Sequence, residues 1–426
     1  MDTIFALASA RGKAGVSVIR ISGERAFEAA AALCGTLPEP RLAGVRPLKF
    51  QGSLLDQALV LAFEEGASFT GERSVELQIH GGAATISAVL AALSRQPGLR
   101  LAEAGEFSRR ALENGRLDLT QIEGLADLID AETEAQRRQA VAVLSGALGR
   151  KAEDWRRDLV RSQSLLEATI DFSEEDVPEV VTEEVSQALG RVRDAIAAEL
   201  AGAGAAERIR EGFEVAIVGA PNVGKSTLLN ALAGREAAIT SEIAGTTRDV
   251  IEVRMEIAGL PVTLLDTAGL RDTQDQIELR GIERALVRAR QADLRVFLVA
   301  DDEELPLVPE ERDLVFLAKA DMREMRAGAV SGLTGEGLDE LIARIAAALE
   351  VLSARPSLVI RERQRHGLER ALANLSSALS LVEVMGAAEL TAEEIRGATR
   401  ALEILIGRVG VEDLLDEIFS RFCIGK

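Results

Sequence analysis

One stretch decides the fold of the central part of the chain: Gly219-Ala220-Pro221-Asn222-Val223-Gly224-Lys225-Ser226. The apolar run at 213–218 before it has the pattern of a buried strand, and residues 227–232 after it have the pattern of a helix. A strand, a G-x-x-x-x-G-K-[ST] loop and a helix in this order predict a P-loop, in which amides at a helix N-terminus bind phosphate. Lys225 is then expected to reach the β- and γ-phosphates, and the Ser226 hydroxyl to bind Mg²⁺.

Two downstream motifs predict the rest of a magnesium and γ-phosphate site. Asp266-Thr267-Ala268-Gly269 follows an apolar run at 262–265, so its aspartate ends a second strand, where it can be linked to Mg²⁺. Gly245-Thr246-Thr247-Arg248-Asp249 lies between this motif and the P-loop, and a threonine hydroxyl there can complete the Mg²⁺ shell. Leu270 stands where many GTPases carry a water-orienting glutamine. Water activation must therefore come from another group.

Two further motifs predict a loop that binds guanine. Lys319-Ala320-Asp321 follows the apolar run at 314–317, and a carboxylate there can pair with the N1–H and 2-amino groups of guanine, which adenine lacks. Ser331-Gly332-Leu333-Thr334-Gly335-Glu336-Gly337 supplies another loop near the base. Any one of these motifs also occurs as an ordinary turn. Five of them in this order and spacing predict a GTPase domain with a doubly wound α/β fold.

The composition is that of a globular chain, and it excludes several classes of protein. The 426 residues are 47% hydrophobic and 28% charged, and no apolar run is long enough to predict a membrane-spanning helix. The formal net charge of −20 argues against non-specific coating of nucleic acid, which needs concentrated positive charge. Cys34 and Cys423 are too few for a disulfide framework, and no secretory signal is visible. We therefore expect a cytoplasmic protein.

Changes in residue pattern divide the chain into four segments. Residues 1–117 mix short apolar strands with a few helical stretches and predict an α+β domain. Residues 118–211 and 352–426 have helical patterns, whereas residues 212–351 alternate strand and helix. This order predicts an α/β domain inserted into a helical domain. The T-x-x-E pattern at 391–394 predicts a capping box at a helix N-terminus.

Further motifs give the chain a specific family resemblance. The segments at 245–249 and 266–271 resemble those of TrmE-type G domains, and the terminal Phe422-Cys423-Ile424-Gly425-Lys426 is similar to that family's C-x-G-K ending. Similar N-terminal segments lie at 105–111 and 114–119, and include Gly15-Val16-Ser17-Val18-Ile19-Arg20-Ile21-Ser22-Gly23 and Val75-Glu76-Leu77-Gln78-Ile79-His80-Gly81-Gly82. Over nearly its full length, the chain resembles the TrmE (MnmE) family of tRNA modification GTPases.

The resemblance implies a function, partners and an architecture. Members of the family install an aminomethyl or carboxymethylaminomethyl group at C5 of the tRNA wobble uridine, in a hetero-oligomer with the FAD-dependent protein MnmG (GidA). The implied fold is an α+β N-terminal domain, a helical bundle and an inserted Ras-like doubly wound P-loop GTPase domain. The N-terminal domain is implied to form a homodimer and to bind 5-formyl- or methylene-tetrahydrofolate as one-carbon donor. No membrane partner is implied.

The resemblance also implies how GTP is hydrolysed. Paired G domains would use Mg²⁺, with K⁺ in place of an arginine finger. The implied catalytic residue is Glu278, at the position of the family's water-orienting glutamate. Mg²⁺ is assigned to Ser226 and Thr247. K⁺ is assigned to the side chains of Asn222, Ser241 and Thr246 and to the carbonyl of Ile243.

Two larger sets of binding residues complete the expected sites. The GTP site comprises Asn222, Val223, Gly224, Lys225, Ser226, Thr227, Ser241, Glu242, Ile243, Ala244, Gly245, Thr246, Thr247, Asp266, Thr267, Ala268, Gly269, Lys319 and Asp321. The folate site, which only the resemblance implies, comprises Arg20, Glu76, Arg116 and Lys426.

The chain departs from the family pattern at several positions, and two alternative functions stay open. Ala318 replaces the asparagine of the family's N-K-x-D motif, Arg73 replaces an acidic residue, and Arg116 replaces a lysine. One alternative is a GTP-regulated ribosome or RNP assembly factor without modification chemistry. The other is a nucleotide-binding scaffold that does not hydrolyse GTP, which Ala318 motivates. The N-terminal segment and the C-x-G-K ending favour tRNA modification, because such factors use neither.

Overall fold

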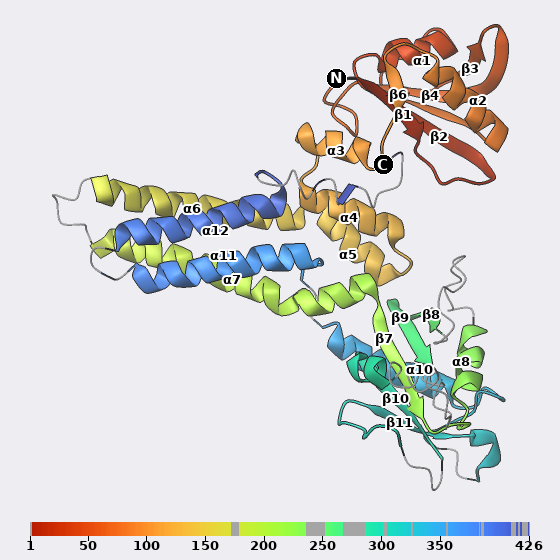
Figure 1. Cartoon of the computed structure of the whole chain (residues 1–426), viewed down its shortest axis with the longest axis vertical. Coiled ribbons are helices and arrows are strands. Elements are labelled where there is room, and N and C mark those ends of the chain that lie inside the picture. Colours follow the sequence, from red (N-terminus) through yellow and green to blue (C-terminus); the bar gives the residue numbers. More distant parts are fainter. Residues whose placement is uncertain are drawn as a thin grey trace, which may run out of the picture. The chain divides into compact units, whose positions relative to one another are not determined.

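The computed structural model describes most of the chain, in two compact units. It describes residues 2–171, 179–235, 252–266, 286–300, 305–324, 327–354, 357–382, 384, 387–409, 415, 418–419 and 425. One unit comprises Met1–Ala126 with Glu403–Lys426, and the other comprises Asp127–Leu402 (Figure 1). The expectations for residues 241–247, 267–270, 278, 423 and 426 lie outside the described residues.

A six-stranded sheet forms the centre of the first unit. Its strand order is β3-β4-β5-β2-β1-β6, and neighbouring strands are antiparallel except β1 and β6. Alternate side chains along a strand point to opposite faces, and α1 (Ala26–Cys34) and α2 (Ala83–Ser94) cover one of these faces. This is the α+β architecture that the sequence predicts. The strands are β1 (Thr3–Leu7), β2 (Ala14–Ser22), β3 (Gly44–Phe50), β4 (Ser53–Phe63), β5 (Ser74–Gly81) and β6 (Leu99–Leu101).

The C-terminal end of the chain packs within this first unit. Leu119 and Ile122 at the start of α4 (Leu119–Asp130) form a buried apolar cluster with Leu415 and Phe419. Gly105 packs against the same phenylalanine, because a Cβ there would lie 2.7 Å from a ring carbon of Phe419. The two ends of the chain therefore share one compact unit.

A buried ionic network ties α3 (Glu106–Glu113) to the same unit. The guanidinium of Arg110 is 5% exposed and pairs with Glu72 at 3.1 Å and with Glu106 at 3.0 Å. Arg100 also pairs with Glu106, at 2.6 Å. Burial opposes ionisation of Glu106, but hydrogen bonds from Arg100, a backbone amide and Arg110 hold its pKa below the usual range.

Four long helices of the second unit pack as a bundle (Figure 1). α7 lies along both α6 and α11, and an ion pair of 3.4 Å between Arg396 and Glu167 joins α12 to α6. A Cβ at Gly397 would lie 2.7 Å from the Asn374 amide nitrogen, so α12 also approaches α11 closely. None of the described helices has the length and hydropathy needed to cross a membrane. The four are α6 (Ala147–Asp171), α7 (Glu179–Glu211), α11 (Glu362–Leu381) and α12 (Ala388–Ile406).

α12 begins earlier than the sequence predicts. The helix starts at residue 388, so the T-x-x-E pattern at 391–394 lies inside it. The Thr391 hydroxyl donates to the carbonyl of Ala387 at 2.9 Å, one turn back. The capping-box prediction is therefore wrong at this position, because a threonine inside a helix can satisfy its hydroxyl on the preceding turn. A capping box is formed instead by Thr133 and Gln136, at the start of α5 (Glu134–Leu144).

A second six-stranded sheet follows α7 in the chain. Its order is β12-β11-β10-β7-β9-β8, and neighbouring strands are parallel except β8 and β9. Because β7 lies between β9 and β10, the carboxyl ends of these strands meet at one edge, where doubly wound sheets bind ligands. The predicted α/β fold of this region is confirmed. The elements are β7 (Phe213–Gly219), α8 (Lys225–Ala233), β8 (Glu252–Ile257), β9 (Leu260–Asp266), β10 (Leu294–Val299), β11 (Leu314–Ala318), η1 (Ala320–Met322), β12 (Ala329–Val330) and α10 (Leu338–Leu352).

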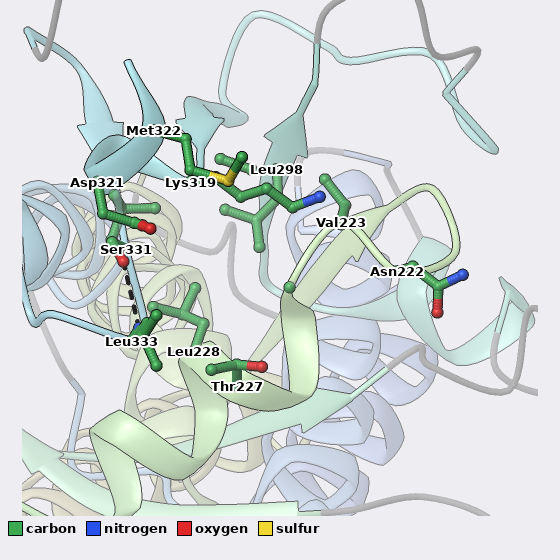
Figure 2. Close-up of a pocket in the computed structure, with 14 residues that line it drawn as sticks. Asn222, Val223, Thr227, Leu228, Leu298, Lys319, Asp321, Met322, Ser331 and Leu333 are labelled. Atoms are coloured by element: carbon green, nitrogen blue, oxygen red, sulfur yellow. Dashed lines mark hydrogen bonds between the residues drawn. The ribbon is translucent and has the colours of Figure 1, made fainter. Parts of the chain in front are cut away.

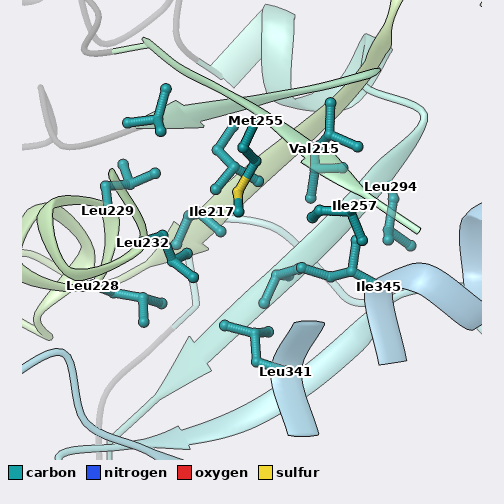
Figure 3. Close-up of a cluster of buried hydrophobic side chains, with 14 of the residues drawn as sticks. Val215, Ile217, Leu228, Leu229, Leu232, Met255, Ile257, Leu294, Leu341 and Ile345 are labelled. Atoms are coloured by element: carbon teal, nitrogen blue, oxygen red, sulfur yellow. The ribbon is translucent and has the colours of Figure 1, made fainter. Parts of the chain in front are cut away.

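An apolar core holds α8 and α10 against this sheet (Figure 3). α8 turns the side chains of Leu228, Leu229 and Leu232 toward the sheet, and each of them is at most 1% exposed. Burial of one such side chain contributes about 1.5–3 kcal/mol. The helix that follows the P-loop is therefore fixed on the sheet. Its partners in the core include Val215, Ile217, Met255, Ile257, Leu294, Leu341 and Ile345.

Candidate nucleotide-binding site

The predicted P-loop connects β7 to α8 at the carboxyl edge of the second sheet. Gly219 ends β7 so close to β10 that a Cβ there would lie 2.6 Å from the carbonyl oxygen of Leu298. Gly224 is the N-cap of α8 and has φ 115°, a conformation that glycine adopts without steric strain. The free amides of the first turn of α8 therefore face the loop, as an anion site requires.

The side chain of Lys225 lies inside this loop. The residue is 4% exposed, and its Nζ atom donates to the carbonyls of Gly219 and Ala220, both at 2.8 Å. These hydrogen bonds hold the ammonium at the centre of the loop. A fixed, compact positive charge is thus placed where the amides of α8 also favour an anion.

Ser226 and Asp266 meet beside the loop. The Ser226 hydroxyl donates to Asp266 Oδ2 at 2.8 Å, although the two residues come from α8 and from the end of β9. Asp266 is 4% exposed, and its Oδ1 atom has no hydrogen-bond partner among the residues that the structure describes. A buried carboxylate oxygen of this kind needs a cation or a bound water. The two side chains therefore fit the predicted Mg²⁺, which prefers a carboxylate and a hydroxyl beside phosphate oxygens.

A cavity of about 280 Å³ lies next to the P-loop (Figure 2). The carboxylate of Asp321 points into it from η1, and Ser331 lies beside this carboxylate. Lys319 has φ 60° and extends its side chain across the cavity toward Val223. A flat, largely apolar ring with hydrogen-bond donors on the edge that faces Asp321 fits this lining. The apolar floor is formed by Leu228, Leu298, Ala318 and Val330.

The loop at 331–334 is packed directly on the P-loop helix. A Cβ at Gly332 would lie 2.6 Å from the backbone nitrogen of Leu228 and 2.6 Å from the carbonyl carbon of Thr227. The amide of Leu333 donates to Ser331 Oγ at 3.2 Å, which closes the turn. The base loop and the phosphate loop are therefore joined by backbone contact, and this contact needs a glycine.

The structure brings predicted residues from three distant segments to one edge of the sheet. The P-loop residues 222–227, Asp266, and the pair Lys319 and Asp321 lie together there. The predicted residues at 241–247 and 267–269, and Glu278, lie outside the described residues. Sequence reasoning did not single out the lining residues Leu228, Leu298, Met322 and Val330, whereas Leu333 lies in the predicted loop at 331–337. Most of these have the spacing of ordinary core positions, which carries no signal for a ligand.

A second candidate site lies on the first unit. Arg20 and Glu76 are paired positions on β2 and β5, and Arg20 Nη2 lies 2.9 Å from Glu76 Oε1. The Arg20 guanidinium also lies over the rings of Phe69 and Phe107, at 5.0 and 5.6 Å from their centroids. The two charged side chains are 20% and 21% exposed, so the pair is accessible from one side. An ion pair beside aromatic rings suits a flat heteroaromatic ligand with its own donors and acceptors.

Neighbours of the other two predicted folate residues lie on the same unit. A Cβ at Gly425 would collide with the carbonyl of Leu7, so the end of the chain runs directly over β1. Lys426 itself lies outside the described residues. The stem of Arg116 lies against Gly71, where a Cβ would be 3.1 Å from Arg116 Cγ. Gly71 belongs to the same loop as Phe69, and the Arg20 guanidinium lies over the ring of Phe69.

The second sheet and its loops define a class of protein. A buried lysine within a P-loop, an aspartate at the end of the adjacent strand and a cavity lined by Lys319 and Asp321 are found together. These are the parts of a P-loop nucleotide-binding protein of the GTPase class.

Comparison with known sequences narrows this class. Residues 119–423 match the family described as MnmE helical domain, and residues 3–116 match the family described as GTP-binding protein TrmE N-terminus. Over 100% of both chains, the sequence is 60% identical to a tRNA modification GTPase MnmE of Cereibacter sphaeroides. It is 58% identical, again over 100% of both chains, to that of Roseobacter denitrificans. The chain belongs to the MnmE (TrmE) family of tRNA modification GTPases.

Two solved structures are similar to part of this chain. Era of Aquifex aeolicus, determined with GDP and AlF₄⁻, is 28% identical, covering 32% of this chain and 56% of that chain, with a TM-score of 0.25. The FeoB G domain of Methanococcus jannaschii is 25% identical, covering 32% of this chain and 98% of that chain, with a TM-score of 0.23.

Proposed function

We propose that the protein is the GTP-hydrolysing subunit of the system that installs an aminomethyl or carboxymethylaminomethyl group at C5 of the tRNA wobble uridine. The observation that carries this proposal is the full-length match, at 60% identity, to a tRNA modification GTPase. The buried Lys225, the pair formed by Ser226 and Asp266, and the cavity below Asp321 support a GTP site in the same chain. The proposed location is the cytoplasm, where tRNA is modified.

Within the G domain, the described residues bind GTP and place charge beside it. Lys225 presents its ammonium to the β- and γ-phosphates, where negative charge spreads as the γ-phosphoryl group passes to water. Asp321 accepts hydrogen bonds from N1–H and the 2-amino group of guanine. Adenine would leave this carboxylate unpaired, which costs more than the loss of a good contact. The Ser226 hydroxyl and the Asp266 carboxylate lie together, and this pair suits a Mg²⁺ ion bound beside the phosphates.

Mg²⁺ and K⁺, when bound, would both supply positive charge at the phosphates, and K⁺ would take the place of an arginine finger. The proposed Mg²⁺ ligands are Ser226 and Thr247. The proposed K⁺ ligands, carried over from the family resemblance, are Asn222, Ser241, Thr246 and the carbonyl of Ile243. Asn222 has φ 60° in the P-loop, on the far side of the loop from Asp321 (Figure 2).

We assign the orientation of the attacking water to Glu278. A carboxylate there can hold the water in line with the γ-phosphate and accept its proton. Leu270 supports this assignment, because an apolar side chain at the usual glutamine position cannot hold a water molecule.

The first unit is the proposed site of one-carbon donor binding and of the homodimer. The cluster of Arg20 and Glu76 with two phenylalanine rings supports binding of 5-formyl- or methylene-tetrahydrofolate, with Arg116 and Lys426 as further contacts. FAD would reside on the partner protein MnmG (GidA), which forms the proposed hetero-oligomer with this chain and with tRNA.

An open face of the first sheet supports the homodimer. Val45, Leu59, Gln78 and Val18 lie opposite one another across β3, β4, β5 and β2. The residues that alternate with them in the middle strands, Ile19, Ala58, Val60, Leu77 and Ile79, pack in one core with α1 and α2, so this row faces the other way. Val45 is 62% exposed and Val16 is 57% exposed. An uncovered sheet face with apolar side chains is suited to a second copy of the chain.

The proposal is tested by nucleoside analysis of tRNA from a strain that lacks the protein. We expect the wobble uridine to lose its C5 substituent, and expect the wild-type chain, but not Lys225→Ala, to restore it. Arg157→Ala serves as control, because its side chain is 67% exposed and pairs with Asp154 in its own helix. Wobble uridine that stays fully modified in the deletion strain would contradict the proposal.

The alternative of a ribosome or RNP assembly factor makes the opposite prediction. The match of residues 3–116 to the TrmE N-terminus family argues against it, because an assembly GTPase has no need of this segment. Intact wobble modification together with accumulation of ribosomal precursor particles in the deletion strain would favour the assembly factor.

A further inference from the structure

The loop between β4 and β5 touches two residues of the proposed one-carbon donor site. In its 68–72 segment, the centroid of the Phe69 ring lies 5.0 Å from the guanidinium carbon of Arg20. Two residues further on, Gly71 has φ 83°, and a Cβ there would lie 3.1 Å from Cγ of Arg116. The conformation of the 68–72 loop therefore affects two proposed donor contacts at once.

Helix α3 holds this loop at two positions. Arg110 Nη1 donates to both carboxylate oxygens of Glu72, at 3.1 Å each. Asn114, which follows α3, donates through its side-chain amide to the carbonyl of Thr70 at 2.8 Å. The side chains of Arg110 and Glu72 are 5% and 14% exposed, so water screens their attraction little. The loop is thus attached firmly to the helix.

A third attachment joins the loop to β2. The Ser22 hydroxyl donates to Glu72 Oε2 at 2.7 Å and also lies 2.7 Å from the hydroxyl of Thr70. Because the one proton of Ser22 goes to the carboxylate, the Thr70 hydroxyl donates to Ser22. Both hydroxyl residues are fully buried. A chain of hydrogen bonds therefore connects α3, the loop and the strand that carries Arg20.

The same helix also contacts the Arg20 guanidinium directly. The centroid of the Phe107 ring lies 5.6 Å from the guanidinium carbon, and Phe69 packs in the apolar cluster that contains Phe107. Phe107 lies one turn before Arg110 on α3. One helix therefore sets the position of both rings, the first as part of the helix and the second through the loop.

The rings matter because the guanidinium is only partly used by the protein. Nε and Nη2 of Arg20 both donate to Glu76 Oε1, at 3.1 and 2.9 Å. Within the described residues, Arg20 Nη1 and Glu76 Oε2 have no hydrogen-bond partner. Aromatic rings against a guanidinium fix the direction in which its remaining donors point. Loss of a ring would therefore loosen the donor that a ligand meets.

We propose that Glu72, Arg110 and Asn114 are positioning residues of the one-carbon donor site. They hold the 68–72 loop on α3, so that Phe69 stays on the Arg20 guanidinium, and they act without touching the donor. This inference rests on the proposed binding of a tetrahydrofolate. A supporting shell of this kind keeps a binding site in its productive geometry.

The test measures binding of 5-formyltetrahydrofolate to the full-length chain by isothermal titration calorimetry. We expect Glu72→Ala to weaken binding by about five- to tenfold, the scale of one lost cation–π contact. Glu72→Gln keeps an acceptor for Arg110 and should lose less. Asn114→Ala strands no charge and should weaken binding by about fivefold, the effect of one hydrogen bond. GDP affinity, which belongs to the other unit, should stay unchanged and reports that each variant is folded.

A double-variant cycle distinguishes positioning from a general effect on the fold. If Glu72 acts through the ring, the double variant Phe69→Leu/Glu72→Ala should bind the folate no more weakly than the weaker of the two single variants. Independent effects would instead multiply.

Two controls are matched to this network. Glu106→Gln removes another partner of Arg110, at 3.0 Å, without touching the loop, and should keep folate affinity within twofold of wild type. Arg73→Gln removes an exposed ion pair with Glu64 at the base of the same loop. It should also have no effect, because exposed pairs contribute little.

Three outcomes would overturn the inference. One is folate affinity within twofold of wild type in both Glu72→Ala and Asn114→Ala. Another is a double variant whose loss equals the product of the two single losses. A third is an equal loss in Glu106→Gln. If the wild-type chain itself does not bind 5-formyltetrahydrofolate, the proposed donor binding fails, and this result is distinct because it needs no variant.

Discussion

The hydroxyl of Ser226 donates a hydrogen bond to the carboxylate of Asp266, with 2.8 Å between Oγ and Oδ2. Ser226 lies in the first turn of α8, and Asp266 is the last residue of β9. They meet because β9 runs parallel to β7, with Asp266 opposite Ile217, two residues before the P-loop begins. The strand pairing therefore sets the geometry of the predicted Mg²⁺ site.

The first prediction concerns this pair. Ser226→Ala removes the hydroxyl that is assigned to Mg²⁺ and leaves Asp266 without its partner. We expect GTP turnover to fall by at least about 10–100-fold, and the Mg²⁺ concentration for half-maximal rate to rise. The measurement is the hydrolysis rate across a Mg²⁺ titration, with Ser353→Ala, at the residue that follows α10, as control. An unchanged Mg²⁺ dependence would show that Ser226 is not a ligand.

The second prediction concerns the monovalent cation. GTP hydrolysis is expected to be faster in K⁺ than in Na⁺ at equal ionic strength, because a K⁺ site places positive charge where it develops in phosphoryl transfer. The comparison is made at a protein concentration at which G domains can pair. Equal rates in the two salts would refute the K⁺ assignment.

The third prediction concerns Glu278. Glu278→Ala is expected to lower kcat by roughly 10²–10⁴, the usual effect of losing a positioned acid–base or water-orienting group. GTP affinity should barely change, since the carboxylate is assigned to the water and not to the nucleotide. Single-turnover hydrolysis and equilibrium binding separate the two quantities. Near-normal turnover would show that Glu278 is an ordinary solvated carboxylate without a role in hydrolysis.

The fourth prediction concerns Ala318, which is buried below the base cavity. Ala318→Asn is expected to tighten GTP and GDP by about 1–2 kcal/mol, the scale of one or two hydrogen bonds. ATP should compete poorly with both the wild type and the variant, because Asp321 alone selects guanine. Titration with labelled GTP and ATP measures both the affinity for guanine nucleotides and the discrimination against ATP. A variant that binds no tighter than wild type would show that the missing asparagine does not limit affinity.

The fifth prediction concerns acid stability of the first unit. Hydrogen bonds from Arg100 and Arg110 outweigh burial and lower the pKa of Glu106 from its usual 4.5. A carboxylate with a lowered folded pKa stabilises the fold above its unfolded pKa, and this contribution is lost as the pH falls below about 4.5. We therefore expect the thermal midpoint of this unit to drop on acidification, and to drop less in Glu106→Gln.

The matched control for this pH effect is Glu39→Gln, an exposed glutamate outside the network. It should show the same acid dependence as the wild type. If Glu106→Gln has the full acid dependence, the network around Arg110 does not set the acid stability of the unit.

Several elements of the fold follow from local patterns, and one does not. The strand at the start of the P-loop and the helix after it lie where the apolar spacing predicts them. The start of α12 was wrongly predicted, because a T-x-x-E pattern is compatible both with a cap and with a helix interior. Only the packing of the helix decides which of the two forms. For the same reason, the partners of a buried ionic residue such as Arg110 have no signature in the sequence.

The amino-acid sequence alone was enough to place the phosphate loop, the aspartate of the proposed Mg²⁺ site and the carboxylate that we propose to bind guanine. Each of these is encoded by adjacent residues, since a strand, a turn and a helix start are short-range structures. The tertiary structure alone decided which distant residues surround them. Sheet pairing and turn packing bring two aromatic rings to Arg20 and place Gly425 against Leu7. They also bring Met322 and Leu333 to the lining of one cavity. Such contacts join segments far apart in the chain, and no local pattern of residues records them.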